Sequence, residues 1–270
     1  RLAQDYRSDR ELKVVWDAGN ASAGPTLLEL VQRLPGHHVV MHEEVDGTFP
    51  AHHPDPTMPE NLSDLIENVR GLGYDIGLAF DGDGDRLGAV DGTGRIVWGD
   101  QLLAIYAAEL LERRPGVEVI ADVKASQVLF DEVARLGGKP VMAATGHSVI
   151  KSMMAESSAP LAGEMSGHVF FADGYYGYDD AIYAAVRLLD IVARSGRSLA
   201  DLVSALPQTV NTPEIRIEIP EERKFAIVNK VMEQARADGL DINDVDGLRV
   251  TGTDGWWLLR ASNTEHALVV

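Results

Sequence analysis

Apolar β-branched runs alternate with amphipathic stretches from the start of the chain, a pattern typical of α/β layers. The run 14–16 predicts a strand, and the apolar positions of 27–34 recur at helical spacing. Pro25 suits the first turn of that helix, because its missing N–H would be unpaired there anyway. The run 39–41 predicts the next strand. The first part of the chain is therefore expected to fold as strand, helix, strand.

A second segment repeats this order. It has an apolar run at 119–121, a helical stripe over 128–136 that ends in two glycines, and a further run at 140–142. Asp17 and Asp122 both stand at the end of the first strand of their unit. The parallel suggests two copies of one α/β fold, although a shared strand-helix-strand plan is common enough to leave duplication open.

The pattern changes after Pro207 and predicts an α+β arrangement. The expected elements are a strand at 215–219, a helix at 225–237 and strands at 248–251 and 256–259. We therefore predict two tandem related α/β domains with mixed sheets flanked by helices, at 1–95 and 96–207, followed by an α+β domain at 208–270. Because the chain stops within an apolar run, we expect this last domain to be partial.

Composition and charge narrow the classes of partner that the protein can have. A net charge of −18 disfavours a nucleic-acid or anionic membrane partner, because those surfaces need a basic face. The chain shows no long apolar run and no export signal, and it has no cysteine, so we expect a soluble, cytoplasmic protein. An anionic substrate would need a local cluster of Lys, Arg, His or backbone N–H groups that reverses the overall field.

Three aspartates alternate with glycines directly after an apolar strand, at Asp81, Asp83 and Asp85. In an extended loop, alternate residues project to the same side, so the three carboxylates are expected to converge on one cation. Oxygen ligands without sulfur favour a hard ion, and Mg²⁺ fits because it needs few carboxylates and accepts a phosphate oxygen. The alternative is a solvated acidic turn, in which three like charges would repel one another.

Glu164, Ser166 and His168 alternate in a second glycine-containing segment. If extended, it presents all three on one face, where a carboxylate and a hydroxyl suit adjacent sugar hydroxyls and a histidine can shuttle protons near neutral pH. An edge strand with a polar face has the same spacing, so spacing alone leaves both readings open.

Further donors for an anion lie in three places. The segment 260–264 combines a guanidinium, two hydroxyls and an amide, which suits a phosphate dianion, although a β-turn explains Ser and Asn equally well. Lys124 follows the first strand of the second unit, and 145–148 lies at a strand-to-helix switch, where α/β sheets present ligand sites. Each is more often structural when taken alone, so their value lies in occurring together.

In this order, the segments 81–86, 145–148, 163–168 and 260–264 resemble the α-D-phosphohexomutases, most closely the bacterial phosphomannomutase/phosphoglucomutase branch. The resemblance covers essentially the whole chain. It implies a four-domain enzyme that converts mannose or glucose 1-phosphate to the 6-phosphate through a hexose 1,6-bisphosphate. Met165, between Glu164 and Ser166, resembles the mannose/glucose branch, whereas a glutamine there would resemble the glucosamine branch.

The resemblance also assigns roles to the candidate residues. Mg²⁺ would be held against a phosphoserine by Asp81, Asp83 and Asp85. The sugar O3 and O4 hydroxyls would be bound by Glu164 and Ser166. The non-reacting phosphate would be bound by Arg260, Ser262, Asn263 and Thr264. The reacting end would be bordered by the electrostatic or acid/base groups Arg86, Lys124, His147 and His168.

One family feature does not occur among the 270 residues, namely the Thr-Ala-Ser-His-Asn-Pro-like loop that carries the phosphoserine. Ser22 follows a strand, but its Gly and Ala neighbours suit a βα turn. We therefore expect domains two, three and part of four, inactive alone. Two other hypotheses are a non-catalytic sugar-phosphate-binding module and a metal-dependent phosphatase with Asp81 as nucleophile, which leaves the other loops unexplained.

Overall fold

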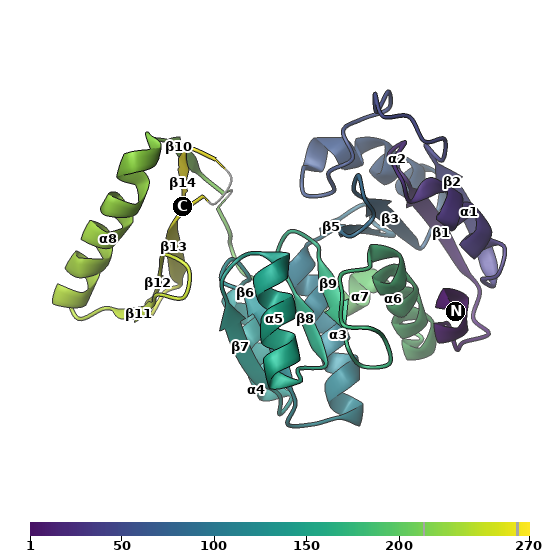
Figure 1. Cartoon of the computed structure of the whole chain (residues 1–270). Coiled ribbons are helices and arrows are strands. Elements are labelled where there is room, and N and C mark those ends of the chain that lie inside the picture. The colour runs from purple at the N-terminus through teal and green to yellow at the C-terminus, as the bar shows by residue number, and fades with distance from the viewer. Residues whose placement is uncertain (213, 263–264) are drawn as a thin grey trace.

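The computed structural model describes residues 1–212, 214–262 and 265–270, which form three units arranged side by side in an arc (Figure 1). The first unit is built on the sheet β2-β1-β3-β4-β5, and the second on the sheet β7-β6-β8-β9. The C-terminal unit is built on the sheet β10-β14-β13-β12-β11. The predicted class, two tandem α/β domains followed by an α+β domain, is confirmed.

The first unit has a mixed sheet in which β1 pairs in parallel with β2 and β3, while β4 and β5 continue antiparallel. Its elements are η1 (Leu2–Asp5), β1 (Leu12–Asp17), α1 (Gly24–Val31), β2 (Gly36–Met41), η2 (Pro59–Leu62), α2 (Ser63–Leu72), β3 (Ile76–Phe80), β4 (Leu87–Asp91) and β5 (Ile96–Val97). Strands β3 and β4 are buried along their whole length, because helices cover the sheet on both faces.

The second unit repeats the core of this plan. Strand β6 pairs in parallel with β7 and β8, and β9 adds antiparallel to β8, as β4 does to β3. Its elements are α3 (Gly99–Arg113), β6 (Glu118–Asp122), α4 (Gln127–Arg135), β7 (Lys139–Ala143), α5 (His147–Ser157), β8 (Leu161–Gly163), β9 (Val169–Phe171), α6 (Ala181–Ser195) and α7 (Leu199–Ser204). The shared strand order supports the duplication that the sequence left open.

Helix α6 joins the first two units into one core. Its residues from Ala181 to Ala193 are all buried, and it packs against β3 and β4 on one side and β9 on the other. A helix that is apolar nearly all round must be covered in this way. Even so, neither α6 nor any other helix in the described part of the chain is long and apolar enough to cross a membrane.

The C-terminal unit is an antiparallel sheet with one long helix on one face. Its elements are β10 (Arg216–Glu218), α8 (Glu221–Ala237), β11 (Asp241–Asn243), β12 (Leu248–Thr251), β13 (Trp256–Ala261) and β14 (Ala267–Val269). Its apolar clusters are small and separate from the shared core of the other two units. Its placement against the second unit is therefore determined largely by the polar contacts described below.

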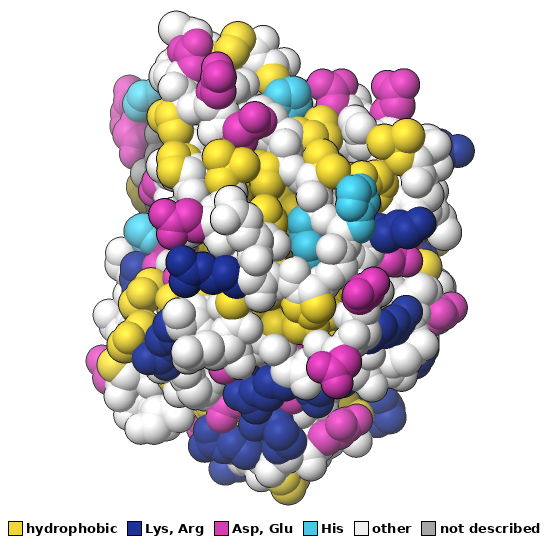
Figure 2. All heavy atoms as spheres, turned by 90° about the vertical axis from the view of Figure 1, so that its right-hand side faces the viewer, with side chains coloured by type: hydrophobic (Ala, Val, Ile, Leu, Met, Phe, Trp, Pro, Cys, Tyr) yellow, Lys and Arg dark blue, Asp and Glu magenta, His cyan; other side chains and the backbone are white. Residues whose placement is uncertain are grey.

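The surface charge is unevenly distributed. Figure 2 shows the face on the right-hand side of Figure 1, where Lys and Arg side chains gather at the lower end and histidines lie in the upper half. The net charge of −18 thus coexists with local positive regions. Such regions can attract anions only at short range, because salt screens exposed charges beyond about 10 Å.

Candidate functional site

Two hairpin loops at equivalent positions of the repeated units lie against each other. Loop 81–86 joins β3 to β4, and loop 164–168 joins β8 to β9. Arg86 and His168 form an isolated antiparallel bridge, and the N–H of Leu87 donates to the carbonyl of Gly167 at 3.0 Å. The backbone itself therefore joins the acidic loop to the loop that carries Glu164, Ser166 and His168.

The acidic loop wraps around the carboxylate of Asp81. Oδ1 accepts hydrogen bonds from the N–H groups of Gly84, Asp85 and Arg86, each at 3.0 Å, and Oδ2 accepts from Arg86 Nε at 2.7 Å. Burial opposes ionisation, but the hydrogen bonds and charge of Arg86 outweigh it and hold the pKa of Asp81 below its usual value. The expected extended loop was wrong: the loop is a tight turn, with Gly84 at a φ of 79°.

The three aspartates nevertheless converge. One oxygen each of Asp81, Asp83 and Asp85 lies within 4.8 Å of the others. Neighbouring ligands of an octahedral Mg²⁺ are about 3 Å apart and opposite ones about 4 Å, so the three oxygens would have to draw closer together to bind one ion. Burial raises the pKa of Asp85 to about 6, and the charges of Asp81 and Asp83 add to this effect while His168 opposes it. A cation would relieve this repulsion, so the donor set fits a hard divalent ion.

His168 is the central side chain of the site. Its Nε2 lies 3.2 Å from Asp85 Oδ1, and its Nδ1 lies 3.1 Å from Glu164 Oε2 and 2.9 Å from Ser166 Oγ. Burial lowers the pKa of His168, but the hydrogen bond to Glu164 and the charge of Asp85 outweigh it, so the pKa is raised. His168 therefore connects the acidic loop to both predicted sugar-binding residues.

Loop 164–168 is also a turn rather than the extended segment that was expected. The N–H of Gly167 donates to the carbonyl of Glu164 at 3.0 Å, and Gly167 has a φ of 100°. A Cβ at Gly167 would lie 2.7 Å from the carbonyl oxygen of Leu87. The close approach of the two loops requires glycine here, and alternation along an extended face is the wrong reason for the convergence of Glu164, Ser166 and His168.

His147 joins this cluster from the first turn of α5. The N–H of Gly146 donates to Glu164 Oε1 at 2.7 Å, and the rings of His147 and His168 are 5.6 Å apart. His147 Nδ1 lies 3.1 Å from Asp179 Oδ2, and Asp179 Oδ1 accepts from Lys151 Nζ at 2.9 Å. Sequence reasoning missed Asp179. The sequence offered no signal for it beyond its place directly before Asp180, the residue that caps α6.

Arg260 and Ser262 belong to the C-terminal unit. Arg260 Nε donates to Asp246 Oδ2 at 2.9 Å, and the same oxygen accepts from the N–H of Thr145 at 3.0 Å. Asp246, which the sequence did not single out, thus links Arg260 to the loop that contacts Glu164. Ser262 Oγ accepts from the N–H of Glu265 at 3.1 Å. Asn263 and Thr264 lie outside the described residues.

Lys124 follows β6, as the sequence predicted. Its Nζ lies 3.5 Å from Glu214 Oε2, in the segment that leads into the C-terminal unit. The ammonium group therefore faces that unit.

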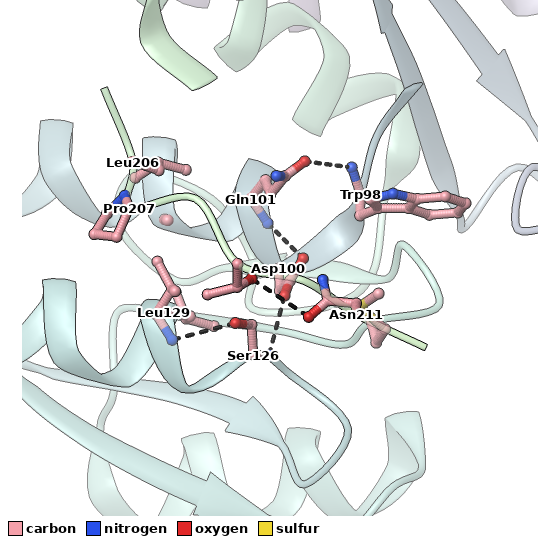
Figure 3. A pocket seen from close by; sticks show the side chains of 12 residues that line it. Trp98, Asp100, Gln101, Ser126, Leu129, Leu206, Pro207 and Asn211 are labelled. Carbon is pink, nitrogen blue, oxygen red and sulfur yellow. Dashed lines mark hydrogen bonds between the residues drawn. The ribbon is translucent and has the colours of Figure 1, made fainter. Parts of the chain in front are cut away.

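A separate pocket lies between α3, α4 and the segment that follows α7 (Figure 3). Asp100 lies at its centre, where Oδ1 accepts from the N–H of Gln101 at 2.8 Å and Oδ2 accepts from the N–H of Ser126 at 3.0 Å. Met165 lines it as well. The pocket is lined by Asp100 and neutral residues, so it is not where the predicted catalytic groups meet.

Tandem α/β domains of one topology, whose strand-end loops meet in a centre of carboxylates, histidines and arginine, define a multidomain phosphohexomutase fold. The chain belongs to the phosphoglucomutase/phosphomannomutase family. The family models for alpha/beta/alpha domain II, alpha/beta/alpha domain III and the C-terminal domain match residues 1–94, 98–210 and 214–270 in this order.

Named relatives agree with this placement. The chain is 45% identical over 270 residues to a phosphomannomutase/phosphoglucomutase of Pseudomonas putida, and 43% identical over 263 residues to a phosphoglucomutase of Neisseria meningitidis. These matches cover 100% and 97% of this chain but 58% and 57% of the relatives. A solved family structure from Burkholderia thailandensis is similar with a TM-score of 0.92 at 44% identity, covering 99% of this chain and 57% of that one. The chain thus spans somewhat more than half the length of these proteins.

Proposed function

We propose that the whole protein interconverts hexose 1-phosphates and 6-phosphates, with mannose and glucose as the sugars, through a hexose 1,6-bisphosphate. The observation that carries the proposal is the contact of His168 with both Asp85 of the acidic loop and Glu164 of the second loop. This contact supports the proposal, because it brings the loop proposed to bind a cation next to the loop proposed to bind sugar hydroxyls. A phosphoryl group transferred to a sugar hydroxyl needs both within one centre.

The acidic loop suits the phosphoryl end of the substrate. Mg²⁺ held by Asp81, Asp83 and Asp85 would neutralise charge on the transferring phosphoryl group. Arg86 is fixed by Asp81 Oδ2 at 2.7 Å and reaches Asp55 at 3.4 Å, so its guanidinium is pre-positioned beside this loop. A cation fixed before the reaction stabilises developing charge without reorganisation.

The second loop suits the sugar. Glu164 and Ser166 offer a carboxylate and a hydroxyl next to His168. Sugar hydroxyls would replace His168 and Gly146 as partners of Glu164. A substitution of Glu164 would then leave those buried hydroxyls without an acceptor. Arg260 and Ser262 supply a charged donor and a hydroxyl for the non-reacting phosphate.

The phosphatase alternative is disfavoured by the geometry of Asp81. Both of its oxygens accept hydrogen bonds, three to Oδ1 and one to Oδ2, and its pKa is low. Oδ2 would have to leave Arg86 before it could attack phosphorus, and a phosphatase leaves loop 164–168 and Arg260 without a role. In the mutase reaction, the phosphoryl group passes from a phosphoserine to the free hydroxyl of the hexose monophosphate, and the other phosphoryl group of the bisphosphate returns to the serine. Since the 270 residues contain no such serine loop, we propose that they bind hexose phosphates but do not convert them alone.

The test is phosphorus NMR of the full-length protein with mannose 1-phosphate or glucose 1-phosphate, Mg²⁺ and a hexose bisphosphate activator. We expect the 6-phosphate to appear, and Glu164→Gln to slow its appearance at least about 100-fold. Glu156→Gln is the matched control, because Glu156 is an exposed carboxylate on α5. Free phosphate as the product would support the phosphatase, and binding without any product would support the binding module.

A further inference from the structure

Arg249 of the C-terminal unit inserts into the second unit. It lies on β12 and is 1% exposed. Its Nη1 donates to the backbone carbonyls of Val123 and Ala125, both at 2.7 Å, and its Nη2 donates to Gln127 Oε1 at 3.1 Å. One guanidinium therefore holds the two carbonyls that flank Lys124.

The guanidinium also contacts one aromatic ring of its own unit and one of the second unit. Its Cζ lies 3.8 Å from the ring centroid of Trp256, on β13, and 5.3 Å from that of Phe130, on α4. Burial lowers the pKa of Arg249 to about 10, while the charges of Asp122 and Asp131 oppose that effect. The partners above are neutral oxygens and rings rather than carboxylates, and a buried cation with such partners needs all of them.

The segment around Lys124 is held by the second unit too. Ala125 N–H donates to the carbonyl of Asp122 at 3.0 Å, and Ser126 N–H donates to Asp100 Oδ2 at 3.0 Å. These bonds fix the backbone after Lys124 but leave the carbonyls of Val123 and Ala125 to Arg249. The orientation of the peptide planes on both sides of Lys124 thus depends on a residue of another unit.

We propose that Arg249 is a positioning residue for Lys124, so that docking of the C-terminal unit and presentation of the Lys124 ammonium are one event. The proposal rests on the proposed function only for the role of Lys124 at the reacting end. It means that the C-terminal unit, which carries Arg260 and Ser262, also determines how Lys124 is presented. A second contact also docks the C-terminal unit onto the second unit, because Asp246 joins Arg260 to Thr145.

The experiment compares Arg249→Lys and Arg249→Met in the full-length protein with Arg236→Lys as control. Arg236 is an exposed arginine on α8 whose partner, Asp244, belongs to its own unit. Lysine keeps the charge but cannot bind two carbonyls and a side-chain oxygen in one plane. Gln127→Ala is a milder second variant, since it removes the side-chain contact and leaves both carbonyls bound.

Hydrogen exchange is the first readout. We expect the amides of 123–126 to exchange about tenfold faster in both Arg249 variants and unchanged in Arg236→Lys. Kinetics are the second: kcat should fall about tenfold or more while KM stays within about threefold, with Arg249→Lys less affected than Arg249→Met.

Unchanged exchange at 123–126 in folded Arg249 variants would overturn the proposal. Faster exchange with an unchanged kcat would overturn the positioning role and leave a structural contact. An inactive wild type would contradict the proposed function instead, and the exchange comparison would still test the contact.

Discussion

His52 lies against the carboxylate that ends β1, with Nε2 3.0 Å from Asp17 Oδ2. Its Nδ1 lies 3.0 Å from the carbonyl oxygen of His53, which fixes the ring. Asp17 Oδ1 accepts from the N–H of Gly19 at 3.0 Å, so both carboxylate oxygens are used. The hydrogen bond to Asp17 raises the pKa of His52 to about 9. A cation therefore compensates this buried carboxylate.

The equivalent carboxylate of the second unit is treated in the opposite way. Asp122 ends β6 and is fully buried. Its Oδ1 accepts from the N–H of Met165 at 3.0 Å, while Oδ2 has no hydrogen-bond partner within the described part of the chain. Burial raises the pKa of Asp122 to about 7. At the equivalent position of the two units, the buried carboxylate is thus paired with a histidine in one and kept from ionising by burial in the other.

His52→Gln should make stability less dependent on pH. The folded pKa of about 9 exceeds the unfolded value of 6.5, so protonated His52 stabilises fully below pH 6.5 and loses this effect as the pH rises through 9. After allowance for solvent screening, we expect a loss of about 1 to 2 kcal/mol at pH 6 that shrinks toward zero at pH 10. Urea unfolding across this range measures it, with exposed His53→Gln as control. A pH-independent difference would contradict the ion pair.

Asp83→Asn should weaken Mg²⁺ binding about tenfold or more, because the cation would lose one charged ligand of three. Isothermal titration of the 270-residue chain measures this. Affinity should be modest even in the wild type, since a phosphate oxygen is expected to complete the shell. Asp254→Asn, in an exposed turn of the C-terminal unit, is the control. Equal Mg²⁺ affinity in Asp83→Asn and wild type would contradict the assignment of a Mg²⁺ site to this loop.

Gly167→Ala should separate the two site loops. Its Cβ would meet the carbonyl oxygen of Leu87 at 2.7 Å, and a φ of 100° disfavours any side chain. Gly174→Ala is a matched control, because Gly174 has a φ of 79° with nothing within 4 Å of the added Cβ. We expect Gly174→Ala to cost about 1 kcal/mol and Gly167→Ala about 1 to 3 kcal/mol more. Equal melting temperatures for the two variants would mean that the loops tolerate separation.

The sequence predicted regular elements where apolar periodicity was strong. The strand at 248–251 was correct to the residue, whereas helix α8 begins at Glu221, four residues earlier than expected. Its first turn, 221–224, consists of charged residues, so it lacks the apolar stripe on which the prediction relied. The three-residue strands β8 and β9 are too short for a period-two signal.

The residues that meet around His168 could be singled out from the sequence, but their geometry could not. Polar residues alternating within glycine-containing segments marked both loops, yet the loops converge through turns at Gly84 and Gly167 rather than along extended faces. Asp246 and Arg249 carried no local signal for docking, because the groups they bind in the second unit are about 100 residues or more away in sequence. Contacts of this kind arise from packing between units, which single-sequence patterns do not encode.

Asp122→Asn should stabilise the protein at pH 7 and above, but not at pH 5. The folded pKa of about 7 exceeds the usual value near 3.8, so folding takes up a proton, and this group costs stability increasingly as the pH rises from about 4 to 7. Asparagine is neutral and can still accept from the N–H of Met165, but its amide N–H lacks a partner. We therefore expect a gain of about 1 to 3 kcal/mol at pH 8 and none, or a small loss, at pH 5.

Asp17→Asn is the matched control at the repeated position, and it should be destabilising at pH 7 because it breaks the pair with His52. Urea unfolding of both variants at the two pH values measures the contrast, and a loss of stability in Asp122→Asn at pH 8 would show that the carboxylate is compensated in the folded protein.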